Sequence, residues 1–141
     1  MLRLCESKDY KDIWEINKED LGYELDLDVC HKQLDKILND KAAVVYVYEC
    51  DGKVVGYIHA RRYDEIYANP MVSVVELTVA KDYRRNGIGG LLLLMVEDWA
   101  SGIGVQGVRL DSGLSRDVAT QFYQAWGYDG LKTNRNYMKF F

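Results

Sequence analysis

A glycine-rich segment, YRRNGIGG at residues 83–90, separates the β-branched run VSVVELTV from the very apolar run LLLLMVEDWA. The first run is typical of a buried strand and the second of a buried helix. So short a segment joins a strand to a helix through a tight turn, and Gly87, Gly89 and Gly90 allow the positive φ angles that such turns use. The segment therefore predicts a strand, a glycine turn and a helix whose first backbone amides are not covered by side chains.

Hydrophobic periodicity predicts ten elements along the chain. Strands are expected at 1–6, 42–50, 53–63, 71–79, 105–112 and 134–141, and helices at 7–23, 27–40, 91–102 and 116–126. Ser7 is expected to cap the first helix, Asp51-Gly52 to form a hairpin turn, and Gly127 to end the last helix. Because antiparallel hairpins come first and a β-α-β unit follows, the order indicates a mixed α/β or α+β sheet.

Composition predicts one folded domain over residues 1–141, since 48% of the residues are hydrophobic and 28% are charged. The net charge of −4 argues against nucleic-acid binding and is compatible with a cationic small substrate. Cys5, Cys30 and Cys50 are odd in number and lack CxxC spacing, so neither disulfides nor a zinc site is expected. The sequence shows neither a signal peptide nor an apolar run of membrane-spanning length, so we expect a cytoplasmic protein.

The glycine turn is expected to bind an anion. The first amides of a helix carry partial positive charge, and Arg84 and Arg85 add guanidinium donors for phosphate oxygens. The alternative is a tight turn with solvated arginines. The Walker pattern is absent because no Lys-Ser/Thr pair follows the glycines, and the dinucleotide pattern GxGxxG would require glycine at Leu92.

Two motifs resemble those of the GNAT superfamily of N-acetyltransferases. Arg84-x-x-Gly87-x-Gly89 is similar to its pyrophosphate loop, preceded by an L-x-V strand at Leu77-Thr78-Val79 and followed by an apolar helix. The segment AxxFYxxxGY at 119–128 is similar to its second signature. The first third of the chain matches only in its order of elements. The resemblance implies a mostly antiparallel mixed sheet with a splayed parallel pair and about four flanking helices.

The resemblance further implies acetyl-CoA as cosubstrate, with no metal required. Its pyrophosphate would bind Arg84, Arg85, Asn86, Gly87, Ile88, Gly89 and Gly90, and its pantetheine arm would pair with Leu77, Thr78 and Val79. The second signature adds Ala119 and Phe122 to the coenzyme site. The Val79 amide is the candidate donor to the oxyanion of the reacting thioester. The alternative is a central strand that is paired along both edges.

Two residues are candidates for the proton transfers. Glu76 lies within an apolar strand beside the expected coenzyme site and is the candidate general base. The alternative is that Glu76 points outward and pairs with a neighbouring cation. Tyr123 matches the family tyrosine that protonates the leaving thiolate, and its ordinary pKa near 10 keeps a phenol protonated at neutral pH. The alternative for Tyr123 is a core aromatic residue.

Other residues depart from the family pattern or carry weaker signals. Lys81 replaces a proline that is usual after the L-x-V strand, and Arg116 replaces an asparagine whose contact to the pantetheine arm is thereby in doubt. His59 can line the acceptor cleft or be structural. Cys5 lacks a His partner that would support a covalent route. The connection between the first two helices carries acids that can hold a cationic substrate or simply be solvated: Glu19, Asp20, Glu24 and Asp26.

The sequence thus predicts an N-acetyltransferase that moves an acetyl group from acetyl-CoA to a primary amine, most simply that of a small molecule. A homodimer is expected, and no nucleic-acid or membrane partner. Three alternatives stay open at this stage: transfer to a protein N-terminus or lysine, a CoA-binding module without turnover, and an unrelated phosphate-binding domain.

Overall fold

A computed structural model describes residues 1–112 and 117–141. The chain divides into two compact units, Met1–Leu110 and Asp111–Phe141. The first unit contains a five-stranded sheet with α1, α2 and α3, and the second contains α4 and the C-terminal segment. The single domain expected over 1–141 stays a prediction.

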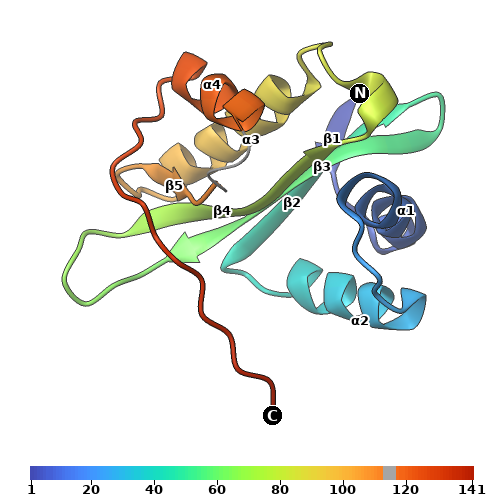
Figure 1. Cartoon of the computed structure of the whole chain (residues 1–141), viewed down its shortest axis with the longest axis horizontal. Coiled ribbons are helices and arrows are strands. Elements are labelled where there is room, and N and C mark those ends of the chain that lie inside the picture. The colour runs from blue at the N-terminus through green and yellow to red at the C-terminus, as the bar shows by residue number, and fades with distance from the viewer. Residues whose placement is uncertain (113–116) are drawn as a thin grey trace. The chain divides into compact units, whose positions relative to one another are not determined.

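The sheet of the first unit has the strand order β1-β2-β3-β4-β5. Its strands are β1 (Leu2–Leu4), β2 (Ala43–Cys50), β3 (Lys53–Tyr63), β4 (Met71–Val79) and β5 (Val108–Leu110). The first four pair antiparallel and β5 lies parallel to β4 (Figure 1). This arrangement confirms the expected mixed, mostly antiparallel sheet. The parallel pair needs a long crossover, which the helix between β4 and β5 supplies.

Helices cover both faces of this sheet. The helices α1 (Tyr10–Leu21) and α2 (Leu27–Leu38) lie on one side, and α3 (Ile88–Gly102) lies on the other (Figure 1). The core under α1 and α2 is built from Cys5, Ile13, Ile16, Leu34, Val45, Val47, Val54 and Tyr57. The opposite face is covered by the apolar side of α3, which buries Ile88, Leu92, Leu93, Val96 and Ala100. Burial of these apolar side chains between the helices and the sheet is the main contribution to the stability of the fold.

A glycine in β3 lets α3 approach the sheet closely. A Cβ atom added at Gly56 would lie 3.3 Å from Ile88 Cγ2 and 3.3 Å from the Thr78 carbonyl oxygen. Any larger residue would therefore push the first turn of α3 away from β3 and β4. Gly56 thus fixes the distance between the start of this helix and the strand that precedes it.

The first helix begins three residues later than expected. Residues Ser7–Asp9 form a 3-10 turn, and the Glu6 amide donates to Asp9 Oδ2 at 2.8 Å. The Ser7 hydroxyl donates instead to the Asp35 carboxylate on α2. The expectation that Ser7 caps this helix is therefore wrong, because Asp9 satisfies the orphan amide and Asp35 is a charged acceptor for the serine.

In the second unit, α4 (Asp117–Ala125) ends before Gly127, which adopts φ 87° as a helix stop requires. Residues 129–141 contain neither helix nor strand, so the strand expected at 134–141 is wrong. A strand is stable only when a neighbouring edge satisfies its backbone groups, and no ladder involves this segment. Its aromatic side chains Tyr137, Phe140 and Phe141 are exposed.

Candidate active site

The edge of β4 that faces β5 is paired only over its first half. β5 pairs with Val72, Ser73 and Val74 and then ends at Leu110. At the same point the β3–β4 register shifts, since His59 pairs with Glu76 but Ala60 pairs with Val74. Val75 is the extra residue of this bulge, which bends the strand. The stretch Val75–Val79, called the open edge below, therefore has no ladder partner from β5.

At the open edge, the backbone N–H and C=O groups of every second residue point away from β3. The Ala80 amide donates to the Val55 carbonyl on β3 at 2.8 Å. Because successive residues of a strand direct their backbone groups to opposite edges, those of Leu77 and Val79 point away from β3. Arg84 Nε donates to the Val79 carbonyl at 2.9 Å, which agrees with this direction. The backbone of Thr78 faces β3 instead, and its contribution to coenzyme binding stays a prediction.

The glycine turn, residues 84–90, leads from the open edge into α3. Arg85 and Gly87 adopt left-handed conformations, with φ 65° and 77°. The first intrahelical bond runs from the Leu91 amide to the Gly87 carbonyl at 3.1 Å. The amides of Ile88, Gly89 and Gly90 therefore precede the hydrogen-bond ladder of the helix, as expected from the sequence. Gly89 and Gly90 lie inside the first turn of α3, which begins at Ile88 rather than at Leu91.

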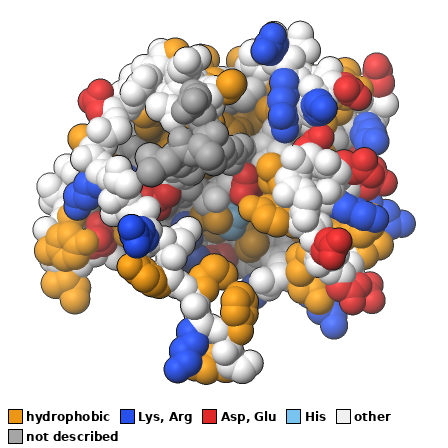
Figure 2. Space-filling view, viewed as in Figure 1, with side chains coloured by type: hydrophobic (Ala, Val, Ile, Leu, Met, Phe, Trp, Pro, Cys, Tyr) orange, Lys and Arg blue, Asp and Glu red, His pale blue; other side chains and the backbone are white. Residues whose placement is uncertain are grey.

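Positive charge gathers at this end of α3. Arg84 and Arg85 are exposed, as is Lys81 in the short 3-10 turn Lys81–Tyr83, and the first turn of α3 contains no acidic residue. Figure 2 shows Lys and Arg side chains gathered at the top of the view, over the connection between β4 and α3. The partial positive charge of the helix N-terminus adds to that of the side chains. Chemically, this end of the unit is suited to bind a polyanion.

Glu76 lies on the face of the sheet that α1 and α2 cover. Directly paired residues of neighbouring strands share a face, and Tyr57, a core residue under α1, pairs with Thr78. Glu76 is two residues from Thr78 and therefore points to the same side. The Thr78 hydroxyl donates to Glu76 Oε1 at 2.8 Å. Among the described residues no lysine or arginine forms an ion pair with Glu76, so the alternative of a cation partner finds no support in the first unit.

His59 lies on β3 directly opposite Glu76. Its Nε2 atom is buried and has no hydrogen-bond partner in the described part of the protein. Burial lowers the pKa of His59, and the nearby Arg61 lowers it further, while Asp40 acts in the opposite direction. The imidazole is therefore held in its neutral form at neutral pH.

The remaining predicted residues lie on α4, in the second unit. Ala119, Phe122 and Tyr123 are half-buried and share one face of this helix, as residues three and four positions apart do. The rings of Phe122 and Tyr123 meet edge to face with centroids 5.1 Å apart, and the Tyr128 amide donates to the Tyr123 carbonyl at 3.0 Å. Their roles in coenzyme binding and proton donation stay predictions. Arg116 lies outside the described residues.

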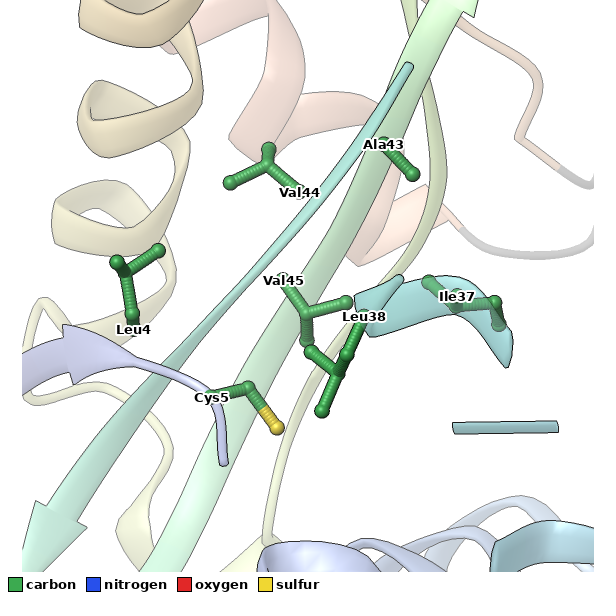
Figure 3. A pocket seen from close by; sticks show the side chains of 7 residues that line it. All are labelled: Leu4, Cys5, Ile37, Leu38, Ala43, Val44 and Val45. Atoms are coloured by element: carbon green, nitrogen blue, oxygen red, sulfur yellow. The ribbon is translucent and has the colours of Figure 1, made fainter. Parts of the chain in front are cut away.

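An apolar cavity of about 180 Å³ lies elsewhere, between β1, β2 and the end of α2 (Figure 3). It is lined by Leu4, Cys5, Ile37, Leu38, Ala43, Val44 and Val45. Burial raises the pKa of the Cys5 thiol to about 12, with smaller contributions from Asp9. The thiolate, which is the nucleophilic form, is therefore not populated at neutral pH, and a covalent route through Cys5 has no support.

Within residues 1–112 and 117–141 no three His, Cys, Asp or Glu side chains are arranged to hold a metal ion. None of the described helices is long and apolar enough to cross a membrane.

Comparison with known proteins assigns the family. A model of the acetyltransferase (GNAT) family matches residues 8–128. The chain belongs to the GNAT acetyltransferase family. It is 35% identical over 83 residues to a probable N-acetyltransferase camello of Xenopus laevis, which is 59% of this chain and 37% of that protein. The corresponding Xenopus tropicalis protein is 34% identical over 86 residues, 61% of this chain and 38% of that one. The chain thus spans less than two-fifths of the length of these relatives.

Solved structures of GNAT-type enzymes share the fold. The aminoglycoside acetyltransferase AAC(6')-Iy, in complex with a bisubstrate analog of CoA and acetylneamine, superposes with TM-score 0.86 at 19% identity, covering 99% of this chain and 97% of that one. The aminoglycoside acetyltransferase meta-AAC0020 from an uncultured soil metagenomic sample, in complex with trehalose, gives 0.84 at 17% identity, covering 100% and 95%. The family and fold predicted from the two sequence motifs are therefore confirmed.

Four contributors to this site were not predicted from the sequence. Tyr57 and Asn17, whose side chains bond each other at 2.7 Å, follow no motif. The bulge at Val75 depends on the pairing register, which one strand alone does not encode. Gly56 did leave a signal, because a glycine within the bulky strand KVVGYIHARRY marks a close approach by another element.

Proposed function

We propose that this protein transfers an acetyl group from acetyl-CoA to the primary amine of a small molecule. One observation carries the proposal: the open edge of β4 continues directly into the uncovered N-terminus of α3. Acetyl-CoA has an amide chain that can pair with the open edge, and next to it a diphosphate that can bind the N-terminus of α3. Aminoglycosides, on which enzymes of similar fold act, are small polyamines and suggest the class of acceptor.

The residues present fit acetyl-CoA. The backbone groups of Leu77 and Val79 would pair with the amides of the pantetheine arm, as a strand edge pairs with an added strand. The glycine turn would hold the pyrophosphate through the amides at 88–90 and through Arg84 and Arg85. When bound, this cosubstrate supplies an acetyl thioester that is activated toward amines. The Val79 amide is the proposed donor to its carbonyl oxygen.

Proton transfers are assigned to two side chains. A primary amine with a pKa of about 10.4 gives up its proton at neutral pH at a cost of about 4.6 kcal/mol. Glu76, whose carboxylate is oriented by Thr78, would accept that proton directly or through one water. Tyr123 would donate a proton to the departing thiolate. The acids at Glu19, Asp20, Glu24 and Asp26, on and after the end of α1, would attract a cationic acceptor.

The proposal includes a cytoplasmic location and a homodimer, the latter to be tested by light scattering. Two related functions compete with it: acetylation of a protein N-terminus or lysine, and CoA binding without turnover. Release of free thiol from acetyl-CoA, measured over a panel of aminoglycosides, polyamines and lysine peptides, separates the three. Turnover with small amines is expected, peptide-only turnover would assign a protein substrate, and no turnover despite CoA binding would assign a binding module.

Coenzyme binding is measured independently of turnover. CoA should raise the melting temperature, whereas ATP and NAD at the same concentration should not. Equal stabilisation by all three would favour an unrelated phosphate-binding domain.

A further inference from the structure

We propose that Thr78 and Tyr57 are positioning residues that hold the Glu76 carboxylate in the direction needed to accept a proton from the acceptor amine. The inference rests on the proposed function, because it takes Glu76 as the general base. The sequence motifs assign this task to neither residue: Thr78 is expected there only as a coenzyme contact, and Tyr57 belongs to no motif. Both are nearly inaccessible to solvent, at 4% exposure for Thr78 and 6% for Tyr57.

A row of polar side chains runs from α1 to Glu76 across β3 and β4. The Tyr57 hydroxyl on β3 donates to Asn17 Oδ1 on α1 at 2.7 Å. Tyr57 and Thr78 are directly paired across β3 and β4, so their side chains lie beside each other on the same face of the sheet. The Thr78 hydroxyl in turn donates to Glu76 Oε1 at 2.8 Å. The carboxylate therefore stands at the end of a row of buried polar side chains that begins on α1, the helix that covers this face of the sheet.

Thr78 is suited to fix a neighbouring glutamate. A glutamate side chain on a strand has three rotatable bonds and loses entropy when it is held in one orientation. A threonine in a strand has a restricted χ1 angle, so its hydroxyl is a donor in a defined place. The bond occupies a single position on Oε1 and leaves Oε2 available to accept a proton.

Tyr57, held by its bond to Asn17, lies beside Thr78 on the same face of the sheet and limits the space in which the threonine side chain can move. Burial raises the pKa of Tyr57 well above its usual value, and the charge of Glu76 raises it further. Its hydroxyl is therefore protonated throughout the physiological range and stays a donor to Asn17. Buried side chains that are fixed in this way favour one orientation of the carboxylate, which a general base requires because proton transfer depends on the distance and angle to the amine.

Removal of the threonine hydroxyl tests the inference. Thr78→Val has nearly the same volume and is expected to lower kcat for the best amine of the panel about tenfold, with the KM for acetyl-CoA unchanged. Thr78→Ser keeps the hydroxyl and should restore most of the rate. Tyr57→Phe should lower kcat by a smaller factor. Tyr46→Phe is the matched control, because Tyr46 pairs with Ile58 on the opposite face of the sheet, and should leave kcat unchanged.

A double-mutant cycle separates positioning from general damage. If Thr78 acts through the carboxylate, Thr78→Val should cause no further loss of kcat in a Glu76→Gln background. Multiplicative losses in the double variant would overturn the inference, as would a wild-type kcat for Thr78→Val. Melting temperatures of all variants verify that each is folded. Should Thr78→Val not fold, Tyr57→Phe and Thr78→Ser are taken through the same cycle.

The outcomes also distinguish this inference from the function on which it rests. Absence of acetyl transfer to every amine would contradict the proposed function. Acetyl transfer that Glu76→Gln leaves undiminished would contradict the assignment of Glu76 as the base, and with it the positioning role, but not the transfer of the acetyl group.

Discussion

Glu76 and His59 lie opposite each other on β4 and β3, yet their surroundings differ. The carboxylate accepts a hydrogen bond from Thr78, whereas the buried His59 Nε2 has no protein partner among the described residues. Because burial keeps the imidazole neutral, the pair carries negative charge and no positive charge. If the acceptor binds here as proposed, such a pair would favour a cationic amine over an anionic acceptor. None of this could be predicted from the sequence, in which the two residues are 17 positions apart.

His59 should make stability depend on pH. Its pKa is lowered on folding, so the unfolded chain, with a pKa of about 6.5, binds the proton first as the pH falls. The protein is therefore expected to lose stability below about pH 6.5, and His59→Gln should lose less between about pH 7.5 and 5.5. Thermal unfolding at the two pH values measures the difference. His31→Gln, at a half-buried helix position, is the control, and an equal drop in wild type and His59→Gln would refute the role of His59.

The proposed role of Tyr123 as the proton donor can be tested by a single substitution. Tyr123→Phe removes the hydroxyl that is proposed to donate the proton but retains the ring that meets Phe122. Turnover should fall by roughly 100-fold while CoA still raises the melting temperature, because general acid catalysis contributes about this factor. Steady-state kinetics with the best amine gives the answer. Turnover equal to that of the wild type would show that the thiolate leaves without this phenol.

At the scale of elements, boundaries that depend on local sequence were predicted and those that depend on a partner were not. The helix α2 and the strands β2, β3 and β4 match the periodicity within one or two residues at each end, because apolar spacing and turn residues are local signals. The prediction of a strand at 134–141 was wrong, because the residue pattern does not indicate whether a neighbouring strand has a free edge to pair with. The open edge was expected only from the family resemblance, since the length of β5 decides it.

The contact between α3 and β3 can be tested through Gly56. Gly56→Ala should lower the free energy of unfolding by about 1–3 kcal/mol, because the new methyl group meets Ile88 and the Thr78 carbonyl. It should also weaken CoA binding, since the first turn of α3 moves away from β4. Gly102→Ala is the matched control: it has open space within 4 Å and lies at the end of the same helix. Urea unfolding and CoA titration of both variants provide the comparison, and equal behaviour would contradict the packing argument.

At the scale of the whole molecule, two motifs on either side of the parallel crossover were enough to predict the family. The glycine turn and the AxxFYxxxGY segment were recognisable because backbone access and helix packing demand particular residue types there. The acceptor was not predictable in the same way. Under the proposed function the acids and the Glu76–His59 pair would favour a cationic acceptor but indicate no particular amine, and the curated relatives are much longer than this chain.

Amide hydrogen exchange is the most direct test of coenzyme binding at the open edge. We propose that this edge of β4 pairs with the pantetheine arm and leads into the free amides of α3. The Leu77 and Val79 amides should therefore exchange rapidly in the free protein and become protected when CoA is added, while the Thr78 amide, which faces β3, is protected in both states. Protection of Leu77 and Val79 in the free protein, or exchange at these two amides that CoA leaves unchanged, would contradict this mode of binding.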